Sequence, residues 1–482
     1  MKIVKLLQNI DILKISGDSG AEVKSICFDS RKAIKGSLFV AVGGNATDGH
    51  QYIAKAAESG ASVIVYQDGE YDISGVTMVK VADSRKALAQ IADNFYDHPS
   101  SKLNLVGITG TNGKTTTVTL LYRLFSSLGY ACGLLSTIAN YIDGKKLEAD
   151  HTTPDPVEIN ALLAEMVEKG CEYCFMEVSS HSLSQDRVFG LKYKVAIFSN
   201  LTHDHLDYHR TFAEYLRCKK IFFDNLDKDA FALTNADDRN GEIMLQNTKA
   251  SQYRYSCRTS ADFHCRIIEQ SLDGMLLEID GVQFWSKFIG AHNAYNLLAV
   301  YGTAMLLGAD KEDVIVKMSA LDSVSGRLEY IKGGKDITAV VDYAHTPDAL
   351  QNVLKTLKEA GCDRQLICVF GCGGDRDKTK RPEMGVIAAQ MSSRVIVTSD
   401  NPRTENPESI INDIKAGLDT TARAKCLFIT DRKEAIRTAI ALANEGAIIL
   451  VAGKGHEDYQ IIGTVKHHFD DKEVIRETFN EM

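Results

Sequence analysis

The sequence lacks the features of a membrane-spanning or secreted chain. No apolar run in its 482 residues approaches the roughly 18 residues that cross a bilayer. The opening stretch, MKIVKLLQNIDILKISGD, has no uninterrupted apolar core of the kind that marks a signal peptide. The eleven cysteines show no framework spacing, and Cys171-x-x-Cys174 has no second pair at zinc-ribbon distance. These absences predict a reduced, cytoplasmic chain.

An excess of positive charge is also missing. The chain has 55 Lys and Arg against 64 Asp and Glu, a net charge of −9, which argues against a binder of duplex DNA or anionic membranes whose whole surface is basic. A peripheral membrane partner stays open. Hydrophobic residues make up 44% of the chain and charged residues 25%, so each domain has enough apolar surface for a core of its own. At about 150 residues per domain, the length predicts three domains.

Local patterns divide the chain into three stretches in which strands alternate with helices. The first, 1–99, ends near the polar break at 98–102, and a second linker surrounds Gly326. We predict a small N-terminal α/β domain over 1–99, a central domain with a mostly parallel, doubly wound sheet over 100–325, and a C-terminal Rossmann-like α/β domain over 326–482. In open sheets of this kind, ligands bind where strands end.

A phosphate-binding loop stands between a predicted strand that starts at Leu103 and a predicted helix that stops at Gly129. Its backbone N–H groups wrap a phosphate, Lys114 supplies a cation and Thr115 supplies a hydroxyl for Mg²⁺. Ile108 stands where the Walker pattern has its first glycine, so the loop is a shortened variant. We predict nucleotide binding by Gly110, Thr111, Asn112, Gly113, Lys114, Thr115 and Thr116.

A second metal ligand is expected at Glu177, near the end of the predicted strand 173–178. A carboxylate buried at a strand end is costly unless it is paired or binds a metal. We therefore predict that Thr115 and Glu177 hold Mg²⁺. A structural acid at the strand end is the alternative.

The segment 202–209 is dense in metal-ligand residue types. It nearly matches the H-x-H-x-D-H pattern of binuclear metallohydrolases, but Tyr208 stands at the last position and a histidine follows one residue late. Such a hydrolase has no use for a phosphate loop. A metallohydrolase based on His203, His205 and His209 stays open as an alternative, as does a surface turn rich in histidine.

Five motifs follow one another in a specific order. They are Gly110-Thr-Asn-Gly-Lys-Thr-Thr116, Glu177-Val-Ser-Ser-His181, Asp204-His-Leu-Asp-Tyr-His209, Asp342-Tyr-Ala-His-Thr-Pro-Asp348 and Gly453-Lys-Gly-His-Glu457. The set resembles the Mur ligases of peptidoglycan synthesis, in particular those that add meso-diaminopimelate to UDP-N-acetylmuramoyl-L-alanyl-D-glutamate. Folylpolyglutamate synthase is a relative whose loop usually has Gly-Ser at the position of Thr115-Thr116.

The resemblance implies an ADP-forming amide ligase that uses ATP and two Mg²⁺ ions. Its N-terminal domain is expected to bind the UDP end of the substrate, its central domain ATP, and its C-terminal domain the incoming amino acid. The γ-carboxylate of D-glutamate is expected to form an acyl phosphate, which the amine of the amino acid then attacks. We expect a monomer.

The resemblance also implies roles for individual residues. UDP-substrate contacts fall on Ser30, Thr152, Thr153, Ser179, Gln185 and Arg187. Further ATP contacts fall on Asn293, Asn296, Arg327, Asp342 and His345, of which the two asparagines, three apart, can share a helix face. The catalytic set is Lys114, Glu177, His205 and Lys219. Without the resemblance, Arg187 is equally compatible with a surface salt bridge.

Lys219 carries the least obvious implication. In the family, a lysine 14 residues after the motif histidine is carbamylated by CO₂, and Lys219 has this spacing from His205. The resulting N6-carboxylysine is an anion that helps to hold a second Mg²⁺. From composition alone, Lys219-Lys220 indicates a solvated helix face.

The loop Asp400-Asn-Pro-Arg403 matches the family members that add meso-diaminopimelate, whereas lysine-adding members usually lack the arginine. Diaminopimelate carries a carboxylate where lysine has none, and a guanidinium group pairs with a carboxylate through two hydrogen bonds. Amino-acid contacts fall on Arg376, Asp400, Asn401, Pro402, Arg403, Gly453 and Glu457. A ligase that adds L-lysine stays open, as does a turn salt bridge for Arg403.

Overall fold

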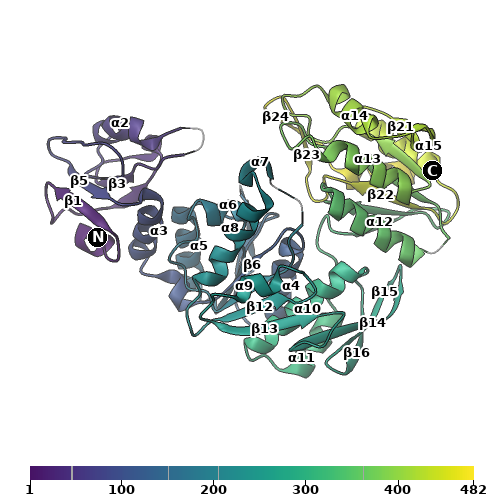
Figure 1. Cartoon of the computed structure of the whole chain (residues 1–482), viewed down its shortest axis with the longest axis horizontal. Helices are drawn as coiled ribbons and strands as arrows, with labels where there is room; N and C mark the ends of the chain where they lie inside the picture. Colours follow the sequence, from purple (N-terminus) through teal and green to yellow (C-terminus); the bar gives the residue numbers. More distant parts are fainter. Residues whose placement is uncertain (45–46, 150, 203, 205, 362, 482) are drawn as a thin grey trace.

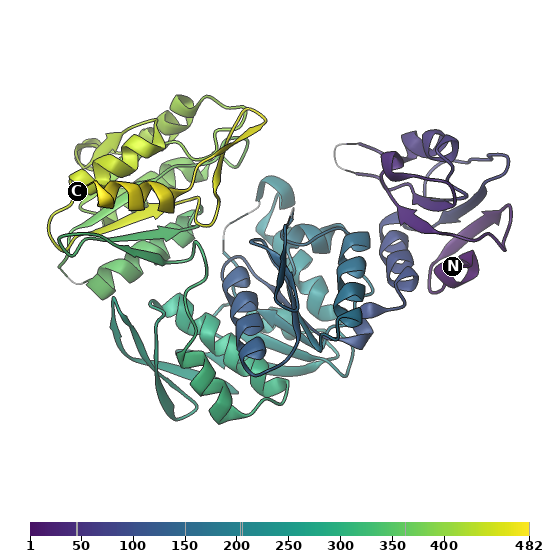
Figure 2. The same cartoon turned by 180° about the vertical axis from the view of Figure 1, so that it is seen from behind.

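The computed structural model describes residues 1–44, 47–149, 151–202, 204, 206–361 and 363–481. They form three α/β domains in a bent row, with the N-terminal and C-terminal domains at its two ends (Figure 1). The view from behind also shows the central domain between the other two (Figure 2). The predicted three-domain architecture is confirmed. The boundaries at 99/100 and 325/326 lie between the sheets and stay a prediction.

The N-terminal domain is built on a five-stranded sheet in the order β1-β5-β4-β3-β2. Strands β2 to β5 run parallel, and β1 pairs antiparallel with β5. The elements are α1 (Ile3–Leu6), β1 (Ile12–Ser16), β2 (Ser25–Cys27), η1 (Ser30–Lys32), β3 (Ser37–Val40), η2 (Gly49–Tyr52), α2 (Ile53–Glu58), β4 (Val63–Tyr66), β5 (Thr77–Val81) and α3 (Ser84–Phe95).

The central domain is built on an eleven-stranded sheet in the order β16-β15-β14-β13-β12-β11-β6-β10-β7-β8-β9. The strands from β14 to β7 in this order run parallel, while β15, β16, β8 and β9 add antiparallel edges. The elements are η3 (Pro99–Lys102), β6 (Asn104–Thr109), α4 (Lys114–Ser127), β7 (Cys132–Leu135), β8 (Asn140–Ile142), β9 (Lys145–Leu147), α5 (Pro156–Glu168), β10 (Tyr173–Glu177), α6 (Ser180–Ser184), β11 (Val195–Phe198), α7 (Leu206–His209), α8 (Phe212–Asp224), β12 (Phe231–Asn235), α9 (Gly241–Leu245), β13 (Ser251–Ser256), β14 (Phe263–Ser271), β15 (Gly274–Ile279), β16 (Val282–Ser286), α10 (Ala291–Leu306) and α11 (Lys311–Ser319).

Helices cover both faces of this sheet, which explains the nearly continuous apolar sequence of its inner strands. On β6, Val106 and Ile108 pack into one core with α4 and α10, while Leu105 points to the opposite core with α5 and α8. The mostly parallel, doubly wound sheet predicted for this domain is confirmed.

The C-terminal domain is built on a six-stranded sheet in the order β17-β18-β22-β19-β20-β21, in which only β17 runs antiparallel to its neighbour. A two-stranded ribbon, β23-β24, lies beside it. The elements are β17 (Glu329–Lys332), β18 (Thr338–Asp342), α12 (Pro347–Gly361), β19 (Leu366–Phe370), α13 (Lys380–Met391), β20 (Arg394–Val397), α14 (Pro407–Ala416), α15 (Thr420–Ala424), β21 (Cys426–Phe428), α16 (Arg432–Ala441), β22 (Ile448–Ala452), β23 (Tyr459–Ile462), β24 (Val465–His468) and α17 (Asp471–Asn480).

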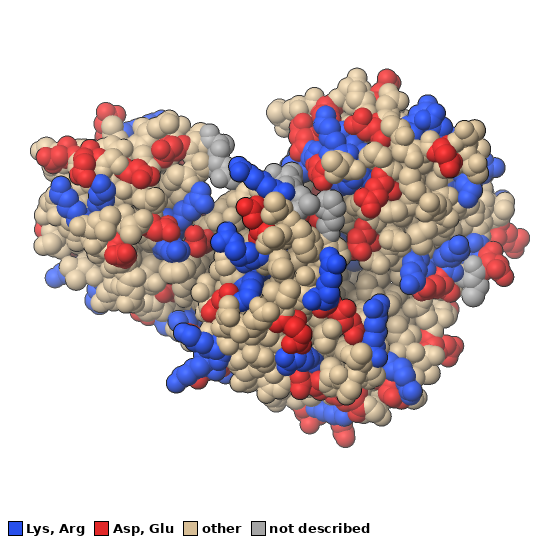
Figure 3. Space-filling model, viewed as in Figure 1, with Lys and Arg blue, Asp and Glu red and all other residues tan. Residues whose placement is uncertain are grey.

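The surface is notched between the two end domains, and acidic and basic side chains are mixed over the face shown in Figure 3. This mixture agrees with the near balance of charges in the sequence. None of the helices in the described ranges is both long enough and apolar enough to cross a membrane.

Candidate active site

The phosphate loop lies at the carboxyl end of β6 and leads into α4. Gly110 and Gly113 have φ angles of 151° and 88°. A Cβ atom on Gly110 would stand 1.9 Å from Oγ of Ser199, and one on Gly113 would stand 2.4 Å from Oδ1 of Asn296. Both distances lie far inside van der Waals contact, so the loop needs glycine at these two positions. It presents the amino end of α4, where free N–H groups favour a phosphate.

Lys114 opens α4 and folds back over the loop. Its Nζ donates to the carbonyl oxygens of Gly110 and Thr111, both at 2.9 Å. Burial lowers the pKa of Lys114, although the nearby carboxylates of Glu177 and Asp204 oppose this shift. The ammonium group therefore lies where an added anion such as a phosphate stabilises its charge.

Lys219 approaches the same loop from α8. Its side chain is buried, and its Nζ donates to the carbonyl oxygen of Gly110 at 2.9 Å and to Oγ1 of Thr109 at 3.5 Å. Burial, and then the charge of Lys114, lower the pKa of Lys219 well below its ordinary value. The solvated helix face that composition indicates is wrong for this residue, because α8 turns the side chain toward the loop. The neighbouring Lys220 pairs with an aspartate one turn along α8.

Two side chains at this loop offer oxygen ligands for a metal, Thr115 within the loop and Glu177 beside it. Glu177 ends β10 with 1% of its surface exposed, and its Oε1 accepts from the backbone N–H of Thr137 at 2.8 Å. Thr115 is also buried, and its Oγ1 accepts from Nη2 of Arg327 at 3.5 Å. A carboxylate and a hydroxyl of this kind fit a hard cation such as Mg²⁺.

Two further predicted ligands, His203 and His205, lie outside the described residues. In the part of the chain that is described, no three or more His, Cys, Asp or Glu side chains gather to hold a metal. Thr115 and Glu177 are the members of the predicted metal-ligand set whose oxygen atoms lie at the loop in the described structure.

One cavity of about 440 Å³ joins the groups around the loop. The side chains that face it come from the central domain and from the C-terminal domain. Among the predicted residues, its lining includes the whole loop from Gly110 to Thr116, together with Thr152, Thr153, Glu177, Ser179, Arg187, Lys219, Arg327, His345 and Arg376.

A second cavity of about 340 Å³ adjoins the loop and is lined by residues of the central and C-terminal domains. Asn112, Gly113 and Thr116 line both cavities. The second one also contains Asn293 and Asn296 of α10, whose side chains are joined by a 3.1 Å hydrogen bond, as their spacing predicts. A nucleotide that spans the loop can therefore place its phosphates in one cavity and its base in the other.

Arg327 and Asp342 close this second cavity from the C-terminal domain. The carboxylate of Asp342 accepts from the backbone N–H groups of Leu328 and Ala344, both at 2.8 Å. Burial raises the pKa of Asp342, and the charge of Arg327 opposes that shift. Nδ1 of His345 lies 2.8 Å from the carbonyl oxygen of Tyr343. These contacts fix the backbone of residues 342–345, which lies beside both cavities.

A third cavity of about 670 Å³ lies between the N-terminal and central domains. Ser30, Gln185 and Arg187 line it, and Arg187 also lines the cavity at the loop. Nη1 of Arg187 donates to the carbonyl oxygen of Thr153 at 2.9 Å, and its Nε and Nη2 donate to Oε1 of Gln185 at 3.0 and 2.7 Å. A substrate that reaches from the N-terminal domain to the loop therefore passes this guanidinium group.

Thr152, Thr153 and Ser179 connect this passage to Glu177. Oγ1 of Thr153 donates to the carbonyl oxygen of Glu177 at 2.8 Å and accepts from the backbone N–H of Ser179 at 3.1 Å. Oγ1 of Thr152 lies 3.1 Å from Oγ1 of Thr137, the residue whose N–H group holds the Glu177 carboxylate. The predicted substrate contacts thus lie beside the predicted metal ligand.

The amino-acid set gathers at the carboxyl ends of β20 and β22. Asn401 Nδ2 donates to Oε2 of Glu457 at 2.8 Å, and a Cβ on Gly453 would stand 3.5 Å from Oδ2 of Asp400. Arg403 has a φ of 51° and donates from Nη1 to the carbonyl oxygen of Gly374 at 2.9 Å. Within the described residues, Nε and Nη2 of Arg403 make no hydrogen bond, so one edge of the guanidinium group can meet a carboxylate.

Of the predicted amino-acid contacts, the structure places only some beside the phosphate loop. Arg376 lines the loop cavity, and a Cβ on Gly373 would lie 2.9 Å from Nη1 of Arg403 and 3.7 Å from Cγ of Arg376. The other predicted amino-acid contacts, Asp400, Asn401, Pro402, Arg403, Gly453 and Glu457, are absent from the described lining of all three cavities. They form a separate polar patch in the C-terminal domain that adjoins the loop cavity through Arg376.

Three family models match this chain, one in each of its three domains. The Mur ligase family catalytic domain matches residues 22–96, the Mur ligase middle domain matches 108–304, and the Mur ligase glutamate ligase domain matches 326–455. The chain belongs to the Mur ligase family. This membership decides against a binuclear metallohydrolase.

Relatives resemble this Mur ligase along its whole length. A UDP-N-acetylmuramoyl-L-alanyl-D-glutamate–2,6-diaminopimelate ligase of Cytophaga hutchinsonii is 51% identical, with 100% of each chain covered. One of Phocaeicola vulgatus is 53% identical, with 99% of each covered. A solved structure with the same enzyme name is 33% identical, covers 97% of each chain and has a TM-score of 0.70.

The cavities of this Mur ligase also contain residues that were not among the predicted contacts, including Asp348 at the end of the fourth motif. Phe28, Lys55 and Arg85 line the cavity of the N-terminal domain, and Asn200 and Asp348 line the nucleotide cavity. Asn200 follows the apolar strand β11, so its position at a strand exit is a signal that could have identified it. Asp348 accepts from Nδ2 of Asn112 at 2.9 Å across the domain boundary, a contact that no local pattern reveals.

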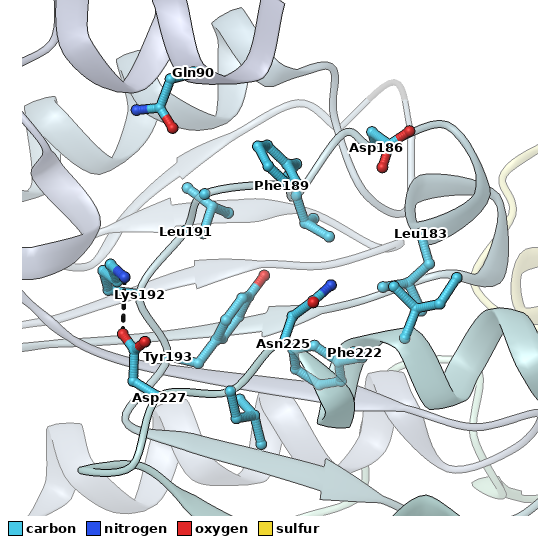
Figure 4. Close-up of a pocket in the computed structure, with 14 residues that line it drawn as sticks. Gln90, Leu183, Asp186, Phe189, Leu191, Lys192, Tyr193, Phe222, Asn225 and Asp227 are labelled. Atoms are coloured by element: carbon cyan, nitrogen blue, oxygen red, sulfur yellow. Dashed lines mark hydrogen bonds and ion pairs between the residues drawn. The ribbon is translucent and has the colours of Figure 1, made fainter. Parts of the chain in front are cut away.

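A further cavity of about 220 Å³ contains none of the predicted site residues in its described lining. Leu183, Tyr193 and Phe222 are among its apolar lining residues, and Gln90 approaches from α3 (Figure 4). Lys192 pairs with an aspartate at its edge, at 2.8 Å. We assign this cavity no role in the Mur ligase reaction.

Proposed function

We propose that this Mur ligase adds meso-diaminopimelate to UDP-N-acetylmuramoyl-L-alanyl-D-glutamate in an ATP-dependent reaction of peptidoglycan precursor synthesis. The single observation that supports this most is the loop cavity. It unites the phosphate loop and Lys219 with Arg187, which also borders the N-terminal cavity, and with Arg376, which adjoins the amino-acid patch. Such a cavity suits a reaction in which three substrates meet.

The proposed reaction has two steps. An oxygen of the D-glutamate γ-carboxylate attacks the γ-phosphorus of ATP, the bond to the bridging oxygen breaks, and ADP leaves. The amine of diaminopimelate then attacks the acyl phosphate, loses a proton, and displaces phosphate to leave an amide. Both steps depend on positioning and on neutralising negative charge, which suits Lys114, Arg187 and Arg376.

Residue roles follow the position of each group. The loop from Gly110 to Thr116 holds the ATP phosphates. The adenine base and the ribose are bound by Asn293, Asn296, Arg327, Asp342 and His345. Ser30, Thr152, Thr153, Ser179, Gln185 and Arg187 bind the UDP substrate.

We further propose that Thr115, Glu177, His205 and a carbamylated Lys219 hold two Mg²⁺ ions. When bound, Mg²⁺ neutralises the charge of the transferring phosphoryl group. The burial of Lys219 supports the modification, because a lysine with a lowered pKa is more often the neutral amine that adds to CO₂. The product is a carbamate anion and a released proton, which replaces a buried cation by a group able to bind a metal.

We infer that the reaction takes place in the cytoplasm, where ATP is available. A monomer is sufficient, since one chain supplies all three cavities and the amino-acid patch.

The deciding assay combines the purified protein with Mg-ATP, the UDP-dipeptide and either diaminopimelate or lysine. We expect ADP and the UDP-tripeptide with diaminopimelate and little product with lysine. Product with lysine alone would favour the lysine-adding alternative. Phosphate release that needs no amino acid would leave only a nucleotidase.

Arg403→Ala tests amino-acid choice. We expect the KM for diaminopimelate to rise about 10- to 100-fold, because the variant loses a charge-assisted pair with the far carboxylate. The KM for the UDP-dipeptide should stay within about twofold. Arg394→Ala, which removes an exposed guanidinium group from β20 of the same domain, is the matched control. Equal losses for both substrates would reject the assignment.

A further inference from the structure

A buried lysine beside the amino-acid patch has no role in the proposed chemistry. Lys454 follows β22, and its side chain is 0% exposed. Its Nζ donates to Oδ1 of Asn401 at 3.0 Å and to Oε2 of Glu457 at 3.3 Å, and it lies 3.5 Å from Oδ1 of Asp400. One ammonium group thus contacts three residues of the patch.

These contacts fix the orientation of Asn401. Its Oδ1 accepts from Lys454 and from the backbone N–H of Ile461 at 2.9 Å, while its Nδ2 donates to Glu457 at 2.8 Å. The amide therefore has one arrangement in which each atom has a suitable partner. Lys454 and Asn401 together hold the Glu457 carboxylate in place.

Around Lys454, two carboxylates share one ammonium group, while Arg403 supplies the other positive charge of the patch. Asp400 and Glu457 are two carboxylates, and Lys454 is the cation that lies within 4 Å of both among the described residues. Oδ1 of Asp400 is buried and accepts no hydrogen bond within the described structure. Its contact is the ion pair with Nζ of Lys454. Burial and the charge of Asp400 raise the pKa of Glu457, and Lys454 opposes that shift.

Arg432, a buried arginine that contacts the backbone on both sides of the patch, already has a carboxylate partner elsewhere. Arg432 pairs through Nε and Nη2 with both carboxylate oxygens of Asp471, each at 2.7 Å. Its Nη1 and Nη2 also donate to the carbonyl oxygens of Ser399 and Ala452. Removal of Lys454 would therefore leave Asp400 and Glu457 without the one cation that contacts both carboxylates in the described structure.

We propose that Lys454 is a positioning residue for amino-acid binding. It holds Asp400, Asn401 and Glu457 as one set of acceptors, with an excess negative charge that an ammonium group of the incoming amino acid completes. Lys454 acts through these side chains and does not itself touch the amino acid. The inference rests on the proposed function, because it takes diaminopimelate as the ligand of the patch.

The test compares Lys454→Gln with wild type in the ligase assay. Gln retains a hydrogen-bond donor but removes the charge, and Lys454→Met removes both. We expect both variants to raise the KM for diaminopimelate at least about tenfold, with kcat and the KM values for ATP and the UDP-dipeptide changed less than about threefold. Lys454→Arg, which restores a cation, should recover part of the affinity. Asp458→Asn, which changes one exposed charge four residues along, should behave as wild type.

The outcomes separate this inference from the proposed function. An active wild type whose KM for diaminopimelate is unchanged in Lys454→Gln overturns the inference alone. A uniform fall in kcat for every substrate, with no recovery in Lys454→Arg, assigns Lys454 a merely structural role and also overturns it. If the Met variant fails to fold, the Gln and Arg variants still decide. A wild type that neither turns over nor gains thermal stability with diaminopimelate overturns both proposals.

Discussion

Replacing Lys219 by alanine is expected to lower ligase turnover about 10²- to 10³-fold, the cost of removing one charge-stabilising group from a site of phosphoryl transfer. The side chain is buried against the carbonyl oxygen of Gly110, so the loss has a local cause at the phosphate loop. The KM for diaminopimelate should change little, because Lys219 does not belong to the amino-acid patch. Steady-state assays of ADP and tripeptide measure both quantities.

The carbamate itself has an independent readout. Wild type incubated with isotopically labelled bicarbonate should gain the mass of one CO₂ on Lys219, and acid should release it. Lys220→Ala, on the same turn of α8, is the matched control, because Lys220 pairs with Asp224 on the same helix rather than with the loop. The Lys219→Ala variant should not regain activity at high bicarbonate concentration, since it has no amine to carbamylate. Full activity of this variant would remove the residue from the proposed mechanism.

Replacing Asp471 by alanine is expected to lower the stability of the C-terminal domain by about 3–5 kcal/mol. Asp471 and Arg432 form an ion pair between α17 and α16 in which both side chains are 0% exposed. Loss of the carboxylate leaves a guanidinium charge buried without its partner. Hydrogen exchange at the amides of β22 and α16 measures the local free energy of opening.

A matched pair joins the same two helices at the surface. Lys433 and Glu477 lie 3.0 Å apart with side chains 41% and 56% exposed, so Glu477→Ala should cost no more than about 1 kcal/mol. The double change Arg432→Met with Asp471→Leu should recover most of the stability, because it removes both buried charges. A loss in Asp471→Ala as small as that in Glu477→Ala would contradict the prediction.

Much of the site could be predicted because its chemistry follows short segments of chain. The phosphate loop is recognisable from glycine, lysine and threonine at fixed spacing between a strand and a helix, and the structure has β6 and α4 on its two sides. The apolar strand before Glu177 likewise indicates where that carboxylate lies. In these cases the decisive contacts are made within a few residues or follow from parallel strands that end at one edge of a sheet.

Burial of polar side chains was the part that sequence patterns predicted least well. Lys219 and Lys220 are adjacent and identical in type, yet only Lys219 is buried against the loop. Lys454 stands in a motif that supplied Gly453 and Glu457 as predicted contacts, while its own contacts with Asp400 and Asn401 depend on a segment more than fifty residues away. A helix period indicates which residues share a face, but not what packs against it.

The sequence by itself determined three α/β domains, the phosphate loop and the family, because periodicity, glycine spacing and motif order are local properties of the chain. Only the tertiary structure decided which charges are buried and which cavities meet. It brought Arg187 to two cavities and Arg376 to the loop, and it left the remaining amino-acid contacts as a separate patch around Lys454. The physical reason is that desolvation and ion pairing depend on neighbours from distant segments, and these neighbours exist only once the domains have packed.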